Sequence, residues 1–234
     1  MSIALAAVLG TTPGWGLLPP SGPPAPCAAA PAPSPAEQPD WAALIGPPPA
    51  EGSPQDAQDL ATLLRLQATR SADDVDRILG EGSLGLAAFT AALGDGFDPG
   101  RCPLTEHLLA KAGRDIKAVV EELKTRFARP RPCLAHPEVV PVTPCHDGFS
   151  YPSFHAARGV LFAALLADLA PDRAPDLQAR GLQIGSDRAL GGLHHPSDVK
   201  AGRTLGAAFL AYWLWHPRHA RLLEEARREE WNGR

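Results

Sequence analysis

The sequence lacks several features that mark membrane proteins and nucleic-acid-binding proteins. Aromatic residues make up only 6% of its 234 residues, and the net charge is −4 rather than strongly positive. This composition disfavours both a stacking surface for single strands and a basic surface for a duplex, so we expect no nucleic-acid partner. The longest apolar runs, 159–170 and 204–215, have about twelve residues each, whereas a membrane-spanning helix needs about 20. We therefore expect no membrane span.

Cysteine is also scarce. The four cysteines are Cys27, Cys102, Cys133 and Cys145, and no two of them have the Cys-x-x-Cys spacing typical of a zinc site. In an exported protein, the last three would give one disulfide and one remaining thiol. We favour a bond between Cys133 and Cys145, while pairing of Cys102 with either of them, or three buried thiols, stays open.

Basic residues are absent before Arg65, although residues 3–9 form an apolar run like the hydrophobic part of a secretory signal. Three alanines at 28–30 offer a cleavage site, but the usual positive charge near the N-terminus is missing. Fourteen of the 26 prolines lie between positions 13 and 54. We interpret residues 1–40 as a signal-like, Pro/Ala-rich disordered leader. This favours a periplasmic or secreted protein over one with a cytoplasmic tail.

Apolar residues recur at helical spacing over the rest of the chain, and no stretch alternates with the period of two that is typical of strands. Helices are expected at 54–70, 71–80, 83–93, 103–127, 153–170, 173–190, 197–215 and 217–230. Residues 128–152 contain six prolines, so we expect an ordered loop without helix there. The sequence thus predicts one all-α domain over residues 41–234.

Three short segments of this domain carry side chains that suit phosphate chemistry. They are Lys124 followed after six residues by Arg131-Pro132, the run Ser153-Phe154-His155, and Arg188 followed by His194 and Asp198. Each segment alone is typical of a solvated helix end or a surface histidine. Their order and spacing together favour a single site.

The cations among these residues form a candidate phosphate-binding set. Lys124, Arg131 and Arg188 would surround an oxyanion, the two arginines in a bidentate manner. Ser153 and Phe154 stand at the expected start of a helix, where backbone N–H groups and the helix dipole attract an anion. We therefore expect the backbone of these two residues to contact phosphate.

The histidines form a candidate catalytic set. His194 and Asp198 are four residues apart, within contact distance if a helical turn lies between them. A carboxylate on one ring nitrogen fixes the tautomer and leaves the other nitrogen to attack. His155 then takes the role of general acid for the leaving group. The adjacent His195 is expected instead to cap the helix that starts near Pro196.

The ordered set of segments resembles the signature of the type 2 phosphatidic acid phosphatase superfamily, which also contains the vanadium haloperoxidases. The similarity runs from about Trp41 to the C-terminus and is greatest to the bacterial class A non-specific acid phosphatases, notably at 44–53 and 150–155. It implies a helical bundle and a periplasmic or secreted enzyme that hydrolyses small phosphomonoesters, such as nucleotides, aryl phosphates and sugar phosphates, without a metal or other cofactor. By position it makes His194 the nucleophile that forms a phosphohistidine and Asp198 its orienting carboxylate.

Two positions depart from the family pattern. Phe154 stands where glycine is usual, and Asp187 stands where serine precedes the third-motif arginine. The ring of Phe154 puts turnover and substrate range in question, and Asp187 would either compete with phosphate or face away. Two alternatives stay open: a vanadate-dependent haloperoxidase with the same anion cage, and a phosphate-binding homologue weakened by Phe154. Assembly into a homodimer or a higher homo-oligomer also stays open.

Overall fold

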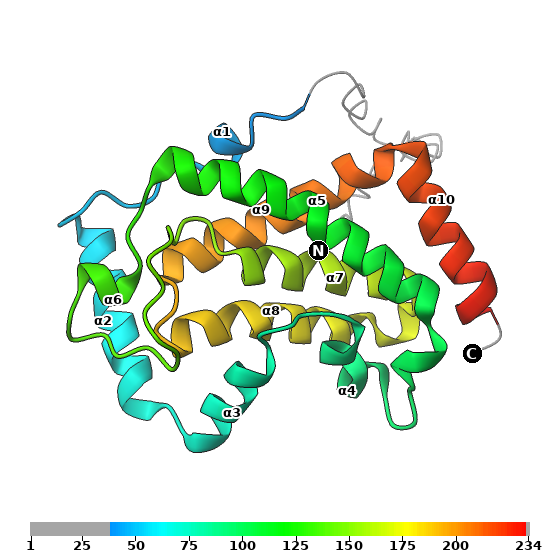
Figure 1. Ribbon diagram of the computed structural model, residues 1–234, viewed down its shortest axis with the longest axis horizontal. Coiled ribbons are helices and arrows are strands. Elements are labelled where there is room, and N and C mark those ends of the chain that lie inside the picture. Colours follow the sequence, from blue (N-terminus) through cyan, green and yellow to red (C-terminus); the bar gives the residue numbers. More distant parts are fainter. Residues whose placement is uncertain (1–37, 233–234) are drawn as a thin grey trace, which may run out of the picture. The chain divides into compact units, whose positions relative to one another are not determined.

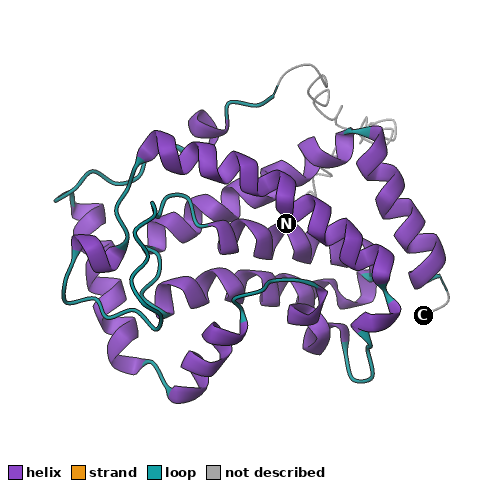
Figure 2. Cartoon of the chain, viewed as in Figure 1, coloured by secondary structure: helices purple, strands orange, loops and turns teal. Residues whose placement is uncertain are grey.

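The structure, a computed structural model, describes residues 38–232. The expected leader at 1–40 falls almost entirely outside the described residues. Within the described part the chain forms helices and loops and contains no strand (Figure 2). The expectation of an all-α fold is therefore confirmed.

The first helices match the expected ones in part: the helices expected from 54 and 71 begin within one residue of these positions, whereas a helix at 41–45 was not expected. They are α1 (Trp41–Ile45), α2 (Pro54–Thr69) and α3 (Ala72–Gly80), followed by the short helical turn Leu86–Phe89 and α4 (Thr90–Leu93). The Ser53 side chain accepts a hydrogen bond from the backbone of Asp56, and Ser71 forms a capping box with Asp74. The single helix expected at 83–93 is wrong, because that segment is divided into two short turns that begin only at Leu86.

The long helix α5 (Pro103–Phe127) starts with proline at its first position, where the missing N–H costs nothing. It ends at Ala128, whose φ of 48° lies in the left-handed region. The expectation of no helix between 128 and 152 is wrong in one place. The four residues of α6 (Pro132–Ala135) form a single helical turn, again with proline at the first position.

The second half of the chain supplies the centre of the bundle (Figure 1). It contains α7 (Phe154–Leu169), α8 (Ala174–Leu190), α9 (Pro196–Trp215), α10 (Pro217–Ala226) and the terminal turn Arg227–Trp231. A short turn at Pro171–Arg173 precedes α8, and a similar turn at Pro99–Arg101 precedes α5 in the first half of the chain. Helix α7 packs against α5, α8 and α9. Its buried side chains, among them Leu161, Phe162 and Leu165, join those of α5 and α9 in one core.

Glycines allow these central helices to approach backbone to backbone. A Cβ atom on Gly202 of α9 would lie 2.3 Å from the carbonyl oxygen of Ser153, and one on Gly206 would lie 2.3 Å from that of Ala157. Only glycine avoids such a collision. The N-terminal ends of α7 and α9 are thereby held together at one end of the bundle.

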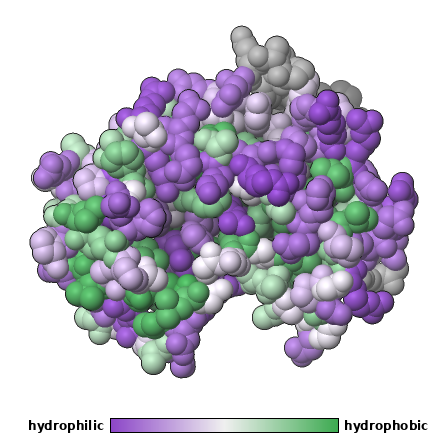
Figure 3. All heavy atoms as spheres, in the orientation of Figure 1, coloured by the Kyte–Doolittle hydropathy of each residue, from purple (hydrophilic) through white to green (hydrophobic). Residues whose placement is uncertain are grey.

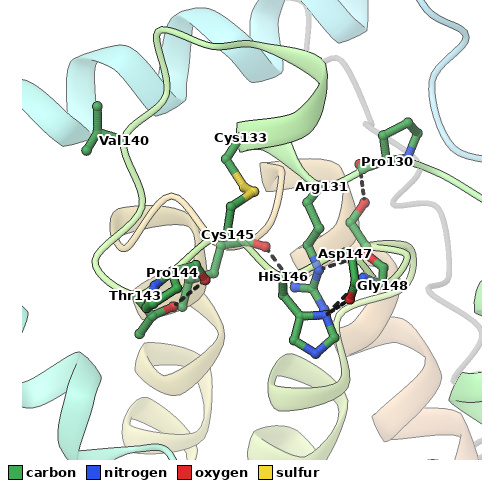
Figure 4. The surroundings of a disulfide bond; sticks show 12 residues. Pro130, Arg131, Cys133, Val140, Thr143, Pro144, Cys145, His146, Asp147 and Gly148 are labelled. Carbon is green, nitrogen blue, oxygen red and sulfur yellow. Dashed lines mark hydrogen bonds and ion pairs between the residues drawn. A yellow bond between two sulfur atoms is a disulfide. The ribbon is translucent and has the colours of Figure 1, made fainter.

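The loop after α5 is cross-linked. Cys133 and Cys145 form a disulfide with a Cα–Cα distance of 6.2 Å (Figure 4), as expected, while Cys102 is buried in the core. On the face shown in Figure 3, apolar side chains lie among polar ones. None of the helices within residues 38–232 is both long enough and apolar enough to cross a membrane.

Candidate active site

The residues singled out from the sequence come together at one end of the bundle, on the left in Figure 1. Each is delivered by an element that ends or begins there: Lys124 by α5, Arg131 by the loop before α6, Ser153 to His155 by the start of α7, Arg188 by α8, His194 by the loop after it, and Asp198 by the first turn of α9. The three segments, distant in sequence, thus share one site, as their spacing predicts.

His194 is the best-defined member of this cluster. Its Nε2 atom lies 2.9 Å from Nη1 of Arg131, whose guanidinium also donates to the carbonyl oxygen of Leu193 at 2.9 Å. Arginine offers only donors, so Nε2 of His194 must be the acceptor in this contact. The imidazole is then neutral with its proton on Nδ1, and the lone pair of Nε2 points toward Arg131, a predicted phosphate-binding residue.

The proton on Nδ1 of His194 faces Asp198. Nδ1 lies 3.5 Å from Oδ2 of Asp198, which is long for a hydrogen bond. The same oxygen accepts from the backbone N–H of His195 at 2.8 Å and lies 3.1 Å from its Nδ1. Burial alone would raise the pKa of Asp198, but its interactions with His194 and His195 outweigh burial and lower that pKa strongly. The surroundings of Asp198 therefore favour its carboxylate form.

The choice between the two adjacent histidines follows from their environments. His195 occupies the N-cap position of α9, as the sequence predicts. His194, in contrast, contacts Arg131. Only His194 therefore has a nitrogen directed at a predicted phosphate-binding residue.

His155 lies close to both His194 and Arg188. Its Nε2 atom is buried and has no hydrogen-bond partner within residues 38–232. Burial, followed by the charges of Arg188, His194 and Arg158, lowers the pKa of His155 to about 3. Burial also lowers the pKa of His194 to about 4; Arg131 acts in the same direction and Asp198 opposes it. Both imidazoles are thus neutral in the ligand-free site at mildly acidic pH.

The cations line the site from two sides. Lys124 is 9% exposed, and burial together with the charge of Arg131 lowers its pKa. A cavity of about 520 Å³ opens beside these two side chains and extends along α5 to Lys117 and across to Phe149 of the loop. Positive charge therefore meets open space where an anion would enter.

The start of α7 differs in part from the expectation. The backbone N–H of Ser153 donates to the carbonyl oxygen of Asp198 at 3.0 Å, so the expected contact of that N–H with phosphate is wrong. The Ser153 side chain instead caps α7 by accepting from Ala156. Phe154 is the first helical residue, and its ring lies 5.0 Å from the guanidinium of Arg158. The ring thus packs on a cation that belongs to the surroundings of His155.

Arg188 has an acidic partner that the sequence did not reveal. Glu81, at the end of α3, accepts from Nη2 of Arg188 at 2.5 Å and lies 2.9 Å from Nη1 of Arg180. Burial and the neighbouring Asp187 raise the pKa of Glu81, while Arg188 opposes them. A single glutamate in a capped helix carries no sequence signal for this role, because its partner lies 107 residues away.

A second buried cation was also missed. Arg129, two residues before Arg131, contacts Asp198 from the side opposite the histidines, at 2.7 Å. The sequence gives no signal for this role, because the burial of Arg129 and its partner 69 residues away are seen only in the structure. Within residues 38–232, no three His, Cys, Asp or Glu side chains gather as metal ligands do.

Comparison with known proteins gives a consistent picture. The model of the PAP2 superfamily matches residues 106–221, which include every candidate residue. The non-specific acid phosphatase of Salmonella typhimurium is 41% identical over 80 residues, which is 34% of this chain and 32% of that protein. The alignment therefore spans about a third of the length of that relative.

Two relatives align over most of their length. The acid phosphatase of Zymomonas mobilis is 28% identical over 193 residues, covering 79% of this chain and 73% of that enzyme. The non-specific acid phosphatase of Providencia stuartii is 25% identical over 202 residues, covering 81% and 80%. The resemblance to non-specific acid phosphatases noted from the sequence is confirmed by these alignments.

The fold also has a solved counterpart. The transmembrane PAP2-type phosphatidylglycerolphosphate phosphatase of Bacillus subtilis superposes with a TM-score of 0.53 at 18% sequence identity. The superposition covers 77% of this chain and 91% of the other. At this level of identity the comparison concerns the fold alone.

Proposed function

We propose that this protein is an acid phosphatase that hydrolyses small phosphomonoesters without a metal ion, because the model of the PAP2 superfamily matches residues 106–221 and the aligned relatives are named acid phosphatases. The substrates would be nucleotides, aryl phosphates and sugar phosphates. The observation that carries the proposal is the contact between Arg131 and Nε2 of His194 at 2.9 Å. The contact supports the proposal because the nitrogen that we assign as the nucleophile lies beside a cation that suits a phosphate oxygen.

In the proposed first step, Lys124, Arg131 and Arg188 bind the phosphate oxygens. Nε2 of His194 attacks phosphorus and forms an N–P bond, while the bond from phosphorus to the ester oxygen breaks. His155 gives a proton to that oxygen, and the alcohol leaves. Asp198 holds the Nδ1 proton of His194 and stabilises the positive charge that develops on the ring.

In the second step, water attacks the phosphohistidine. His155, now neutral, takes a proton from the water as the new O–P bond forms and the N–P bond breaks. Inorganic phosphate leaves, and His194 returns to its neutral form. The cations stabilise the negative charge of both transition states, which is usually the largest contribution to such a reaction.

The general acid needs a proton that the free site does not retain. The pKa of His155 is about 3 when the site is empty. A phosphate dianion beside the ring favours the charged imidazolium and raises this pKa. We therefore expect the bound substrate itself to restore the proton on His155.

We also propose that the protein is exported, with residues 1–40 as the leader and residues 41–234 as the phosphatase domain. The disulfide between Cys133 and Cys145 supports this location, since such bonds persist mainly in oxidising compartments.

The test uses the full chain with p-nitrophenyl phosphate and a panel of nucleotides and sugar phosphates, with EDTA present throughout. We expect release of inorganic phosphate and an acid-labile phosphoprotein that is absent in His194→Ala. Loss of activity on chelation, restored by a divalent ion, would contradict metal independence. If added vanadate confers bromide oxidation by peroxide faster than phosphate release, the haloperoxidase alternative is correct. Phosphate binding without turnover would identify a weakened homologue.

A further inference from the structure

Arg129 forms a buried network behind the proposed catalytic pair. The residue is 7% exposed, and its Nη1 atom donates to Oδ1 of Asp198 at 2.7 Å and to Oγ of Ser197 at 2.6 Å. Its Nη2 atom donates to Asp56 and Asp59 of α2, both at 3.1 Å. One guanidinium thus joins the loop after α5 to the starts of α2 and α9.

The two oxygens of Asp198 have different partners. Oδ1 accepts from Arg129, whereas Oδ2 faces Nδ1 of His194 and His195. A carboxylate with one oxygen fixed cannot rotate freely about its terminal bond. The contact with Arg129 therefore orients the carboxylate from one side, while the backbone N–H of His195 holds Oδ2 at 2.8 Å from the other.

The far side of Arg129 is also anchored. Asp59 is 1% exposed; it accepts from the backbone N–H of Ser197 at 3.2 Å and from the Ser197 hydroxyl. Ser197 lies directly before Asp198, so α2 holds the same turn of α9 in two ways. Burying so many charges is costly and is weak evidence for stability alone. A role in the chemistry of Asp198 accounts for this arrangement better.

We propose that Arg129 is a positioning residue for phosphoryl transfer: by fixing Oδ1 of Asp198, it helps to direct Oδ2 toward Nδ1 of His194. Asp59 and Ser197 hold Arg129 in place. The proposal rests on the proposed function, since it assigns the network to the nucleophile of that reaction.

The neighbouring histidine makes this positioning necessary. Oδ2 of Asp198 lies 3.1 Å from Nδ1 of His195 but 3.5 Å from that of His194. If Arg129 is lost, the contacts with His195 are the ones that still hold the carboxylate, and nothing on the Oδ1 side keeps Oδ2 within reach of His194. His194 would then lose the contact that fixes its tautomer, although its own position in the chain is unchanged.

The ionisation of Asp198 depends on all the groups that surround it. Arg129, Lys124 and Arg131 supply positive charge from α5 and the loop after it. The other neighbours are His194, His195 and the phenol of Tyr151. Arg129 is the cation that touches the carboxylate directly, at 2.7 Å. Its removal takes away a positive charge in contact with the carboxylate and therefore raises the pKa of Asp198.

The test compares Arg129→Lys and Arg129→Met in the full chain with Arg126→Met, a matched control. Arg126 lies three residues earlier, and its side chain is 62% exposed. For Arg129→Met we expect kcat to fall about 10- to 100-fold, the range seen when outer partners of catalytic groups are removed. The inhibition constant of inorganic phosphate should change less than about threefold, and the acid side of the kcat profile should move to higher pH. Arg129→Lys should recover part of kcat because it restores the charge.

A second measurement does not depend on turnover. In the NMR spectrum of the wild type, the Nδ1 proton of His194 should be protected from exchange and shifted downfield by Asp198. Arg129→Met should lose this signal, as His194→Ala does, while Arg126→Met keeps it. Asp59→Asn should weaken it with a smaller loss of kcat, and circular dichroism reports whether each variant is folded.

Three outcomes would overturn the proposal. The first is a folded Arg129→Met with unchanged kcat, pH profile and His194 signal, which would make the network purely structural. The second is a rise in KM and in the phosphate inhibition constant at constant kcat, which would make Arg129 a ligand-binding residue. The third is a His194 signal that survives in Arg129→Met. The wild type could also be inactive on the whole substrate panel and still show the His194 signal, with the signal lost in Arg129→Met. That result would contradict the proposed function and leave the positioning role supported.

Discussion

Arg77 of α3 and Asp187 of α8 form a bidentate ion pair, and Asp187 directly precedes Arg188, one of the three predicted phosphate-binding cations. Nε and Nη2 of Arg77 donate to the two oxygens of Asp187 at 3.1 and 2.9 Å. Asp187, which replaces the serine usual in the family, is thus directed toward α3 rather than across the face of Arg188 that a phosphate would use. The substitution brings an acidic residue into the motif, and the fold neutralises it with a partner 110 residues away.

Removal of Arg77 should therefore expose the acidic residue. In Arg77→Ala, Asp187 loses its partner beside Glu81 and Arg188, and its negative charge competes with phosphate. We expect the KM for p-nitrophenyl phosphate to rise several-fold while kcat changes less. Restoring serine in Arg77→Ala/Asp187→Ser should return KM toward the wild-type value, and the exposed Arg65→Ala serves as control. Equal KM values for Arg77→Ala and the wild type would show that Asp187 does not reach the site.

The two adjacent histidines should respond very differently to substitution. His194→Ala removes the nucleophile, so both phosphate release and the covalent intermediate should be lost. His195→Ala removes only the N-cap side chain of α9 and should cost about 1 kcal/mol of stability with most of the activity retained. The measurements are phosphoprotein trapping and denaturant unfolding. If His194→Ala retains most of its activity and His195→Ala is inactive, the assignment of the nucleophile to His194 is wrong.

The role of His155 should appear in the dependence on the leaving group. p-Nitrophenolate leaves readily without a proton, whereas an alkoxide does not. His155→Ala should therefore slow hydrolysis of glycerol phosphate much more than that of p-nitrophenyl phosphate. Comparison of kcat for the two substrates in the wild type and the variant checks this. Equal losses on both substrates would remove His155 from the role of general acid.

The pH dependence should separate the free enzyme from the enzyme–substrate complex. His194 must be neutral to attack, and its pKa of about 4 places the loss of activity on the acid side near that value. His155 must be protonated, and its pKa of about 3 in the empty site makes kcat/KM fall as pH rises above that region. In the complex the phosphate dianion raises the pKa of His155, so kcat should peak at a higher pH, roughly 5 to 6.5.

Two measurements check this division between the histidines. The first is the pair of pH profiles, for kcat and for kcat/KM, recorded in the wild type. The second is calorimetry of phosphate binding near pH 6 in buffers of different ionisation enthalpy, which should show uptake of a proton that His155→Asn abolishes. A kcat that continues to rise beyond about pH 8, well above the ordinary pKa of histidine, would contradict both assignments.

The disulfide should affect both stability and phosphate binding. It closes a loop of 12 positions, for which the expected contribution is about 3 kcal/mol. Arg131 lies two residues before Cys133, and its Nε donates to the carbonyl oxygen of Gly148, just beyond Cys145 (Figure 4). Cys133→Ser/Cys145→Ser should therefore unfold at lower denaturant concentration and show a higher KM. Reductant should lower the stability and raise the KM of the wild type in the same way, and it should leave the double variant unchanged. If the disulfide is shown to be reduced and the wild type keeps its stability and KM, the prediction is contradicted.

Much of this protein follows from local features of its sequence. The serines at 53 and 71 and the prolines at 54, 103 and 196 predict helix starts because they satisfy or remove N–H groups within one turn. The spacing of His194 and Asp198 also predicts their approach, although His194 lies in the loop just before the N-cap of α9 rather than within a helical turn. The predicted disulfide also joins residues close in sequence. In each case the interacting groups lie within one turn or one loop.

The tertiary structure alone decided which charges are paired. Arg129 with Asp59, Arg188 with Glu81, and Arg77 with Asp187 join residues separated by 70 to 110 positions. It also decided that the N–H of Ser153 binds the carbonyl of Asp198 instead of facing the anion site. Local spacing carries no information on such partners, because they meet only when α2 packs against α8 and α9 and α3 packs against α8. Burial then makes each pairing necessary, since an unpaired charge inside the bundle would cost several kcal/mol.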